Sequence, residues 1–324
     1  MPTVLFSAPY MLPSIDRFRP VFERYGVSLI PVKVQERLCE EELLEYAGKI
    51  DGVLCGDDRF SAHVLEAYAP RLKVISKWGT GIDSIDQQAA ARLGVQVCRT
   101  PNAFTLPVAD SVLGYILSFA RRLPWMDSLM KTGGWQKIPG RSLSECTLGV
   151  VGVGNIGKAV LRRARAFGMR LLGNDILPIA PDFILENGVE MVGLETLLGR
   201  SDFVSLNADL NPTSYHLINA HALALMKPGA VLINTARGPL VDEPALVEAL
   251  QKGIIAGAGL DVYEVEPLPP GSPLLQMEQV MLAPHNANSS PAAWERVHWN
   301  TIRNLLEGLS IPCDDLEAWK ANSK

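Results

Sequence analysis

The chain has 324 residues, 48% hydrophobic and 20% charged, which is typical of a globular protein of about two domains. Its formal net charge is −5 and its Lys and Arg residues form no basic stripe, so we do not expect nucleic acid as a partner. No apolar stretch reaches the ~18 residues of a membrane span, and the N-terminus lacks a basic signal-peptide start. We therefore expect a cytoplasmic protein with no membrane partner. The scattered Cys residues form no C-x-x-C pair, which indicates reduced thiols and no metal site.

The N-terminal third of the chain alternates short apolar runs with helical patterns. Strands are predicted at 3–7, 27–32, 52–55, 73–76 and 95–98. Helices are predicted between them, at 40–49 and 61–68 for example. Apolar strands that alternate with amphipathic helices indicate parallel β-α units with helices on both faces of a sheet.

A second alternating series follows one long helical pattern. Pro101 and Asn102 end the first block, a helix is predicted at about 108–130, and Gly133 and Gly134 end it. From Thr147 on, the strand candidates are TLGVVG, RLLGND, VEMV, DFVSLN, AVLINTA, AGAGLDV and QVMLAP. A last helix is predicted at 292–309, followed by a polar tail. The predicted class is α/β, with two parallel-sheet domains.

The run Gly152-Val153-Gly154-Asn155-Ile156-Gly157 fits the pattern G-x-G-x-x-G, follows an apolar strand and opens a predicted helix. In such a turn the first Gly allows the tight bend, the second lets the backbone approach a pyrophosphate, and the third lets helix and strand pack closely. Asp175 ends the next predicted strand. A carboxylate there accepts hydrogen bonds from a ribose 2′-hydroxyl and repels a 2′-phosphate, so the predicted cofactor is NAD rather than NADP.

Charged residues follow three later strand candidates, where ligands bind in doubly wound sheets. Arg237 can grip a carboxylate with paired hydrogen bonds. His285 can donate or accept a proton near neutral pH. Asp261, Glu264 and Glu266 lie in or after the run GLDVYEVEP, and the pattern alone leaves open whether these acids are functional or merely solvated. The remaining histidines are interpreted as structural: His63, His216, His221 and His298.

Blocks spread over most of the chain together resemble the D-isomer-specific 2-hydroxyacid dehydrogenases, and most closely their phosphoglycerate dehydrogenase-like branch. They are KWGTGIDSID (77–86), RTPNAFTLPVADSVLGYIL (99–117), LGVVGVGNIG (148–157), DFVSLNADLNPTSYHLIN (202–219), MKPGAVLINTARGPLVDEPALVEAL (226–250), GLDVYEVEPLP (259–269) and APHNA (283–287). The resemblance implies a Rossmann NAD-binding domain (102–290) inserted into a smaller flavodoxin-like substrate domain (1–101 plus 291–324). It also implies a homodimer built through the NAD-binding domain.

The resemblance assigns roles by matching position. Arg237 would orient the substrate, and His285 would be the acid/base with Glu266 as its acidic partner, whereas Glu264 would be a loop residue. The expected cofactor contacts are Thr100, Val108, Gly152, Gly154, Asn155, Ile156, Gly157, Asp175, Thr235, Arg237, Asp261 and His285. The expected substrate contacts are Ser76, Lys77, Trp78 and Gly79 of the loop at 76–81, together with Arg237.

The implied activity is the NAD-dependent interconversion of a small 2-oxo acid and its D-2-hydroxy acid. Lys77 either binds a substrate phosphate, as in 3-phosphoglycerate, or reaches solvent, and Trp78 replaces a small residue of the family. Asn207 stands where many members have His. Glyoxylate and hydroxypyruvate are alternative substrates, with formate and phosphite more remote. A non-catalytic NAD(H)-sensing protein of the corepressor type is a further alternative, which the intact Arg-Glu-His set disfavours.

Overall fold

The computed structural model describes residues 1–322, which form two compact units. Unit 1 comprises Met1–Phe104 and the C-terminal segment from Ser290 on, and unit 2 is Thr105–Ser289. The first segment of unit 1 therefore ends three residues later than the boundary at 101, because Phe104 packs on Trp78 with ring centroids 5.6 Å apart. Its second segment begins at Ser290, whose side chain caps the following helix. None of the helices in residues 1–322 has both the length and the apolar character needed to cross a membrane.

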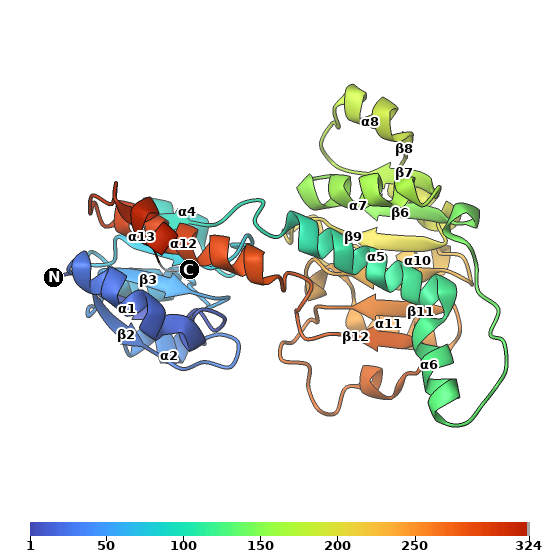
Figure 1. The fold of residues 1–324 in the computed structure, drawn as a ribbon, viewed down its shortest axis with the longest axis horizontal. Helices are drawn as coiled ribbons and strands as arrows, with labels where there is room; N and C mark the ends of the chain where they lie inside the picture. The colour runs from blue at the N-terminus through green and yellow to red at the C-terminus, as the bar shows by residue number, and fades with distance from the viewer. Residues whose placement is uncertain (323–324) are drawn as a thin grey trace. The chain divides into compact units, whose positions relative to one another are not determined.

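Unit 1 contains a five-stranded sheet in which all neighbouring strands are parallel (Figure 1). Its strands are β1 (Thr3–Phe6), β2 (Ser28–Pro31), β3 (Gly52–Cys55), β4 (Val74–Lys77) and β5 (Gln96–Cys98). The order β2-β1-β3-β4-β5 is the flavodoxin-like arrangement. Both this order and the position of every strand, to within about one residue at each end, confirm the sequence prediction.

Helices cover both faces of this sheet. On one face the apolar side chains of α2 (Glu40–Leu44), α3 (Ala62–Tyr68) and α4 (Gln87–Arg92) join a common core. The other face carries α12 (Pro291–Gly308) and α1 (Ile15–Arg24), and Phe18 of α1 packs edge-on against Trp299 of α12.

The predicted polar tail contains a short helix, α13 (Leu316–Asn322). Leu316 is buried, and the segment is tied to the rest of unit 1 by the ion pairs Arg24–Asp315 and Arg303–Glu317.

Unit 2 contains a seven-stranded parallel sheet of order β12-β11-β10-β9-β6-β7-β8. The strands are β6 (Thr147–Val151), β7 (Arg170–Asn174), β8 (Val189–Met191), β9 (Phe203–Leu206), β10 (Val231–Asn234), β11 (Gly257–Leu260) and β12 (Val280–Leu282). The direction of winding reverses between β6 and β9, which is the switch point at which doubly wound sheets bind dinucleotides. The predicted Rossmann arrangement is thus confirmed.

Two helical layers enclose this sheet. Figure 1 shows α5 (Thr105–Arg121) and α7 (Asn155–Ala166) in front of it, where their side chains share one core. Residues of α9 (Leu194–Arg200), α10 (Ala220–Leu225) and α11 (Glu243–Gln251) form the core on the opposite face. The short helix α8 (Pro181–Asn187) adds Phe183 to the first core.

The single helix predicted at 108–130 is wrong, since the structure has two, α5 and α6 (Leu123–Lys131). Arg122 between them has a left-handed backbone, with φ of 56°. Pro124 causes the break, because its ring clashes with the carbonyl four residues earlier and it has no N–H to donate. That carbonyl, of Ala120, instead accepts a hydrogen bond from the backbone of Arg141 at 2.8 Å.

Candidate active site

The glycine motif of unit 2 forms a tight turn between β6 and α7. Gly152 has φ of 87°, and a Cβ there would lie 2.6 Å from the nitrogen of Ala208. A Cβ at Gly157 would lie 2.0 Å from the oxygen of Gly152, so helix and turn pack too closely for any side chain. At Gly154, the first position before α7, a Cβ would have no protein atom within 4 Å. The room at Gly154 and the exposed N-terminus of α7 fit a pyrophosphate.

Asp175 follows β7 beside this turn. Its Oδ2 accepts a hydrogen bond from the backbone of Val153 at 2.7 Å, and its Oδ1 accepts one from Leu177 at 2.8 Å. Two backbone bonds therefore fix the carboxylate against the glycine turn. Each carboxylate oxygen can accept a second bond, so the group fits the ribose 2′-hydroxyl that the sequence analysis assigned to it.

Two buried side-chain oxygens lie at the carboxyl ends of β9 and β10. Within residues 1–322, the side-chain oxygens of Asn207, after β9, and Thr235, after β10, have no hydrogen-bond partner. Buried polar atoms normally have partners, so a pair of orphaned acceptors at this sheet edge fits a ligand that supplies hydroxyl or amide donors. Thr235 was a predicted cofactor contact. The sequence analysis noted Asn207 only as a departure from the family, although its place after a strand could have marked it.

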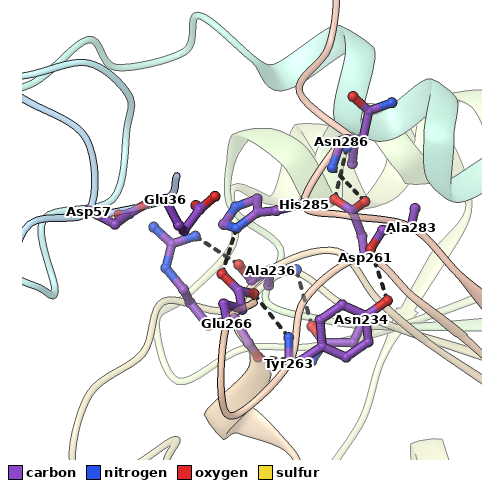
Figure 2. A network of polar contacts seen from close by, with 12 residues as sticks. Glu36, Asp57, Asn234, Ala236, Asp261, Tyr263, Glu266, Ala283, His285 and Asn286 are labelled. Carbon is purple, nitrogen blue, oxygen red and sulfur yellow. Dashed lines mark hydrogen bonds and ion pairs between the residues drawn. The ribbon is translucent and has the colours of Figure 1, made fainter. Parts of the chain in front are cut away.

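His285 and Glu266 form a pair at the ends of β12 and β11 (Figure 2). Nδ1 of His285 lies 3.0 Å from Oε2 of Glu266, and the other oxygen of Glu266 accepts the backbone N–H of Tyr263 at 3.0 Å. A carboxylate at Nδ1 keeps a proton on that nitrogen and leaves Nε2 for exchange with a substrate. The side chains are 21% and 15% exposed, so the pair is largely shielded from solvent.

Asp261 holds the turn that carries His285. Its buried carboxylate accepts the backbone N–H groups of Asn286 at 2.7 Å and Ala287 at 2.8 Å, and its carbonyl accepts the N–H of His285 at 2.8 Å (Figure 2). Burial raises the pKa of Asp261, and these backbone bonds oppose that effect. The contacts explain the left-handed backbone of His285, with φ of 52°. Asp261, predicted as a cofactor contact, thus has a structural task in this unit.

Arg237 lies on the segment after β10. Asn234 fixes this segment, because its side chain donates to the oxygen of Arg237 at 2.8 Å and accepts the N–H of Ala236 at 3.1 Å. Gly238 brings the segment against the next one, since a Cβ there would lie 1.9 Å from the carbonyl carbon of Tyr263. Arg237, Glu266 and His285 therefore follow three neighbouring strands at one edge of the sheet.

Sequence reasoning missed the residues that brace this edge. Besides Asn234 and Gly238, the hydroxyl of Tyr263 donates to the carbonyl of Ala283 at 2.9 Å, just before His285. Burial raises the pKa of this hydroxyl to about 12, so it is a constant donor. All three residues lie inside the sequence blocks of the resemblance, but Gly238 and Tyr263 meet segments that follow other strands.

In unit 1, the predicted substrate loop is held by polar contacts. Nζ of Lys77 lies 2.7 Å from Oδ1 of Asp57, and the Lys77 side chain is only 4% exposed. Nε1 of Trp78 donates to Nδ1 of His298 at 2.8 Å. Burial lowers the pKa of His298 to about 4, so its ring is neutral and can accept. Lys77 therefore neither reaches solvent nor presents an uncompensated charge.

Other predicted residues of this loop have partners of their own. The hydroxyl of Ser76 donates to the oxygen of Thr301 at 2.8 Å and is buried. The oxygen of Gly79 accepts both the N–H of Thr100, at 2.8 Å, and its hydroxyl, at 2.9 Å. Thr100, predicted as a cofactor contact, thus belongs to unit 1 and braces Gly79, whereas Val108 lies buried on α5 of unit 2.

Residues 113–287 match the model of the D-isomer specific 2-hydroxyacid dehydrogenase, NAD binding domain. The chain is 43% identical over 255 residues to a glyoxylate reductase of Korarchaeum cryptofilum, covering 77% of this chain and 76% of that protein. It is 40% identical over 267 residues to a D-3-phosphoglycerate dehydrogenase of Methanocaldococcus jannaschii, covering 81% of this chain but 50% of that protein.

The fold is similar to that of solved enzymes. The crystal structure of D-lactate dehydrogenase from Aquifex aeolicus, complexed with NAD and lactic acid, matches with a TM-score of 0.84 at 28% identity. The match covers 95% of this chain and 97% of that chain.

Proposed function

The chain belongs to the D-isomer specific 2-hydroxyacid dehydrogenases, which are NAD-dependent oxidoreductases, and from this membership we propose that Arg237, Glu266 and His285 carry its catalysis. The observation that supports this assignment is the 3.0 Å contact between Glu266 and His285 at the sheet edge that also carries Arg237. Such a pair favours catalysis over an NAD(H)-sensing role, because it provides a proton donor near neutral pH.

The glycine turn and Asp175 would hold NAD, and the bound cofactor would supply the hydride chemistry at the substrate carbon. In reduction, Nε2 of His285 donates a proton to the substrate oxygen, and in oxidation it takes that proton back. Glu266 stabilises the charged ring through Nδ1. Arg237 pairs with the substrate carboxylate and stabilises the negative charge that develops on the oxygen.

We further propose that the substrate is a small 2-oxo acid without a phosphate, such as glyoxylate or hydroxypyruvate. The supporting observation is the Lys77–Asp57 pair, because a phosphate at Lys77 would have to displace or tolerate a carboxylate 2.7 Å away. A second acid lies next in sequence, Asp58, and burial raises its pKa to about 6, so it is largely ionised at neutral pH. Both groups oppose a further anion.

Steady-state kinetics with NADH test this proposal. The expected order of kcat/KM places glyoxylate or hydroxypyruvate above phosphohydroxypyruvate. Asp57→Asn should raise the kcat/KM ratio of phosphohydroxypyruvate to hydroxypyruvate by about tenfold, as expected for releasing about 1.4 kcal/mol of charge interaction. Glu66→Gln is the matched control, because it removes the same charge from an exposed pair of unit 1. A wild-type preference for the phosphorylated acid would overturn the substrate proposal.

We also propose a homodimer formed through unit 2. Helix α6 buries none of its residues, and large apolar side chains are exposed along it and just after it, at Leu123, Met130 and Trp135. Trp135 is 84% exposed. Apolar surface of this kind, gathered on one helix and the segment that follows, is typical of a protein interface.

A further inference from the structure

His216 and Glu264 form a close contact outside the proposed catalytic set. His216 lies on the segment between β9 and α10, and Glu264 lies on the segment after β11, two residues before Glu266. Nε2 of His216 is 2.5 Å from Oε1 of Glu264. His216 was interpreted as structural and Glu264 as a loop residue, yet their contact joins two segments at the sheet edge that carries Arg237 and Glu266.

The main chain of His216 is bound to the segment that carries Arg237. Its N–H donates to the oxygen of Pro239 at 2.8 Å, and the N–H of Ile218 donates to the oxygen of Leu240 at 3.0 Å. The oxygen of Ile218 in turn accepts the N–H of Asp242 at 3.1 Å. These bonds fix the post-β9 segment along residues 238–242, directly after Arg237.

The His216 backbone is thus bound to the segment after β10, which carries Arg237, while its ring reaches the segment after β11, which carries Glu266. At Gly238 the two segments touch, since a Cβ there would lie 2.5 Å from the nitrogen of Glu264. The contact between the His216 ring and the Glu264 carboxylate holds the Tyr263–Glu266 segment. One residue thus binds the Arg237 segment by its backbone and the Glu266 segment by its ring.

Three acidic residues lie around the His216 ring, two of them besides Glu264. Oδ2 of Asp242 lies 4.0 Å from Nδ1 of His216, and Glu243 exchanges backbone-to-carboxylate bonds of 3.2 and 3.4 Å with Glu264. Burial and the neighbouring Glu264 raise the pKa of Glu243. Without the contact from the His216 ring, the carboxylates of Asp242, Glu243 and Glu264 would face one another, and their mutual repulsion would push Glu264 away.

The conformation of His216 shows that the surrounding structure holds it in place. Its φ of 48° is uncommon for a residue other than glycine, and such a backbone persists only where neighbours fix it. Tyr215 stacks on its ring with centroids 4.0 Å apart and planes at 16°. The ring is thus limited to the orientation that points Nε2 at Glu264.

We propose that His216 is a positioning residue, whose contact with Glu264 fixes the segment of Glu266 against the segment of Arg237. The inference rests on the proposed catalytic roles of those two residues. Loss of the contact releases Tyr263–Glu266, and the 3.0 Å contact between Glu266 and His285 lengthens. The charge that favours protonated His285 is then further away, so proton donation fails at lower pH.

His216→Leu tests this inference. A displacement of about 1 Å in a catalytic group can cost up to about 100-fold, so we expect kcat of reduction to fall by about 10- to 100-fold. The high-pH limb of the profile for reduction should move to lower pH. His216→Gln should recover most of the rate, because its amide nitrogen can reach Glu264. Adding Glu264→Gln to His216→Leu should restore part of the rate, because it removes the repulsion among the acids.

The dissociation constant of NADH, measured by fluorescence, should stay within about twofold, because the glycine turn and Asp175 are elsewhere in unit 2. The matched control is His221→Leu, since His221 is an exposed histidine of α10 that lies 4.0 Å from Glu195. If His216→Leu does not fold, Glu264→Ala breaks the same contact and should also lower kcat, but by less, because it removes one of the repelling acids as well.

Three results would overturn the inference. They are a wild-type rate and pH profile in the variant without the contact, an equal loss of NADH binding and turnover, and no rescue by either Gln substitution. His285→Ala measured in parallel separates the two proposals. An active His285→Ala enzyme contradicts the proposed function, whereas an inactive one beside a normal His216→Leu enzyme contradicts only this inference.

Discussion

Acidification from pH 7 to pH 4 is expected to destabilise unit 1 through His298. Burial lowers the pKa of this ring to about 4, whereas an unfolded histidine titrates near 6.5. Between these values the unfolded chain binds more protons than the folded one, so the stabilising contribution falls as the pH falls. The difference between the folded and unfolded pKa values of His298, at about 1.4 kcal/mol for each pH unit, corresponds to about 3 kcal/mol of unfolding free energy.

The test compares the chain with His298→Asn, which keeps an oxygen to accept the 2.8 Å bond from Nε1 of Trp78 but cannot titrate. Asp58 titrates in the opposite sense, because burial raises its pKa to about 6 and the folded state then binds the extra proton. The wild-type pH dependence is therefore shallow, and the difference between the two proteins isolates His298.

Urea unfolding followed by tryptophan fluorescence at several pH values measures this difference. We expect the free energy of unfolding of the variant, relative to the wild type, to rise by about 3 kcal/mol between pH 7 and pH 4. Parallel pH dependences in the two proteins would refute the reasoning. Because Trp78 lies in the proposed substrate loop, the wild-type KM for the 2-oxo acid should also rise in acid before NADH binding weakens.

Two further predictions concern unit 2. Asp175→Ala should lower the selectivity for NADH over NADPH by about tenfold or more, because it removes a carboxylate that would face the 2′-phosphate, and an unchanged kcat/KM ratio would contradict that role. Sedimentation should show a homodimer at micromolar concentration, and Trp135→Ser should weaken it because the indole is 84% exposed in the single chain. A monomeric wild type would remove the dimer proposal.

Local rules predicted much of the fold and part of the site. The strands of both sheets are short and apolar, and glycines at 152 and 157 are required by contacts of 2.6 and 2.0 Å that any Cβ would make. Because these positions accept only glycine, the sequence pattern predicts the turn. The positions of Asp175 and His285 directly after strands were equally readable, because parallel strands present their carboxyl ends at one edge.

Contacts between distant segments left no such trace. The partner of Lys77 is Asp57, which lies beyond the end of the neighbouring strand, and only the parallel register that pairs Cys55 with Lys77 brings it close. The same holds for His216, whose partner Glu264 is 48 residues away. The helix break at Arg122 was different, because it could have been predicted from the sequence. Pro124 indicates a break, but the apolar pattern continues on both sides of it and favoured one long helix.

The rate of hydride transfer to the 2-oxo acid in His285→Ala tests the central claim most directly. Positioned proton transfer contributes about 10²–10⁴-fold, so single-turnover oxidation of bound NADH should slow by that factor while NADH affinity is kept. Glu266→Gln, measured alongside, should keep activity at low pH but lose its plateau at lower pH than the wild type. Single-turnover reduction by His285→Ala within a few-fold of the wild-type rate would contradict the catalytic assignment and favour an NAD(H)-sensing role.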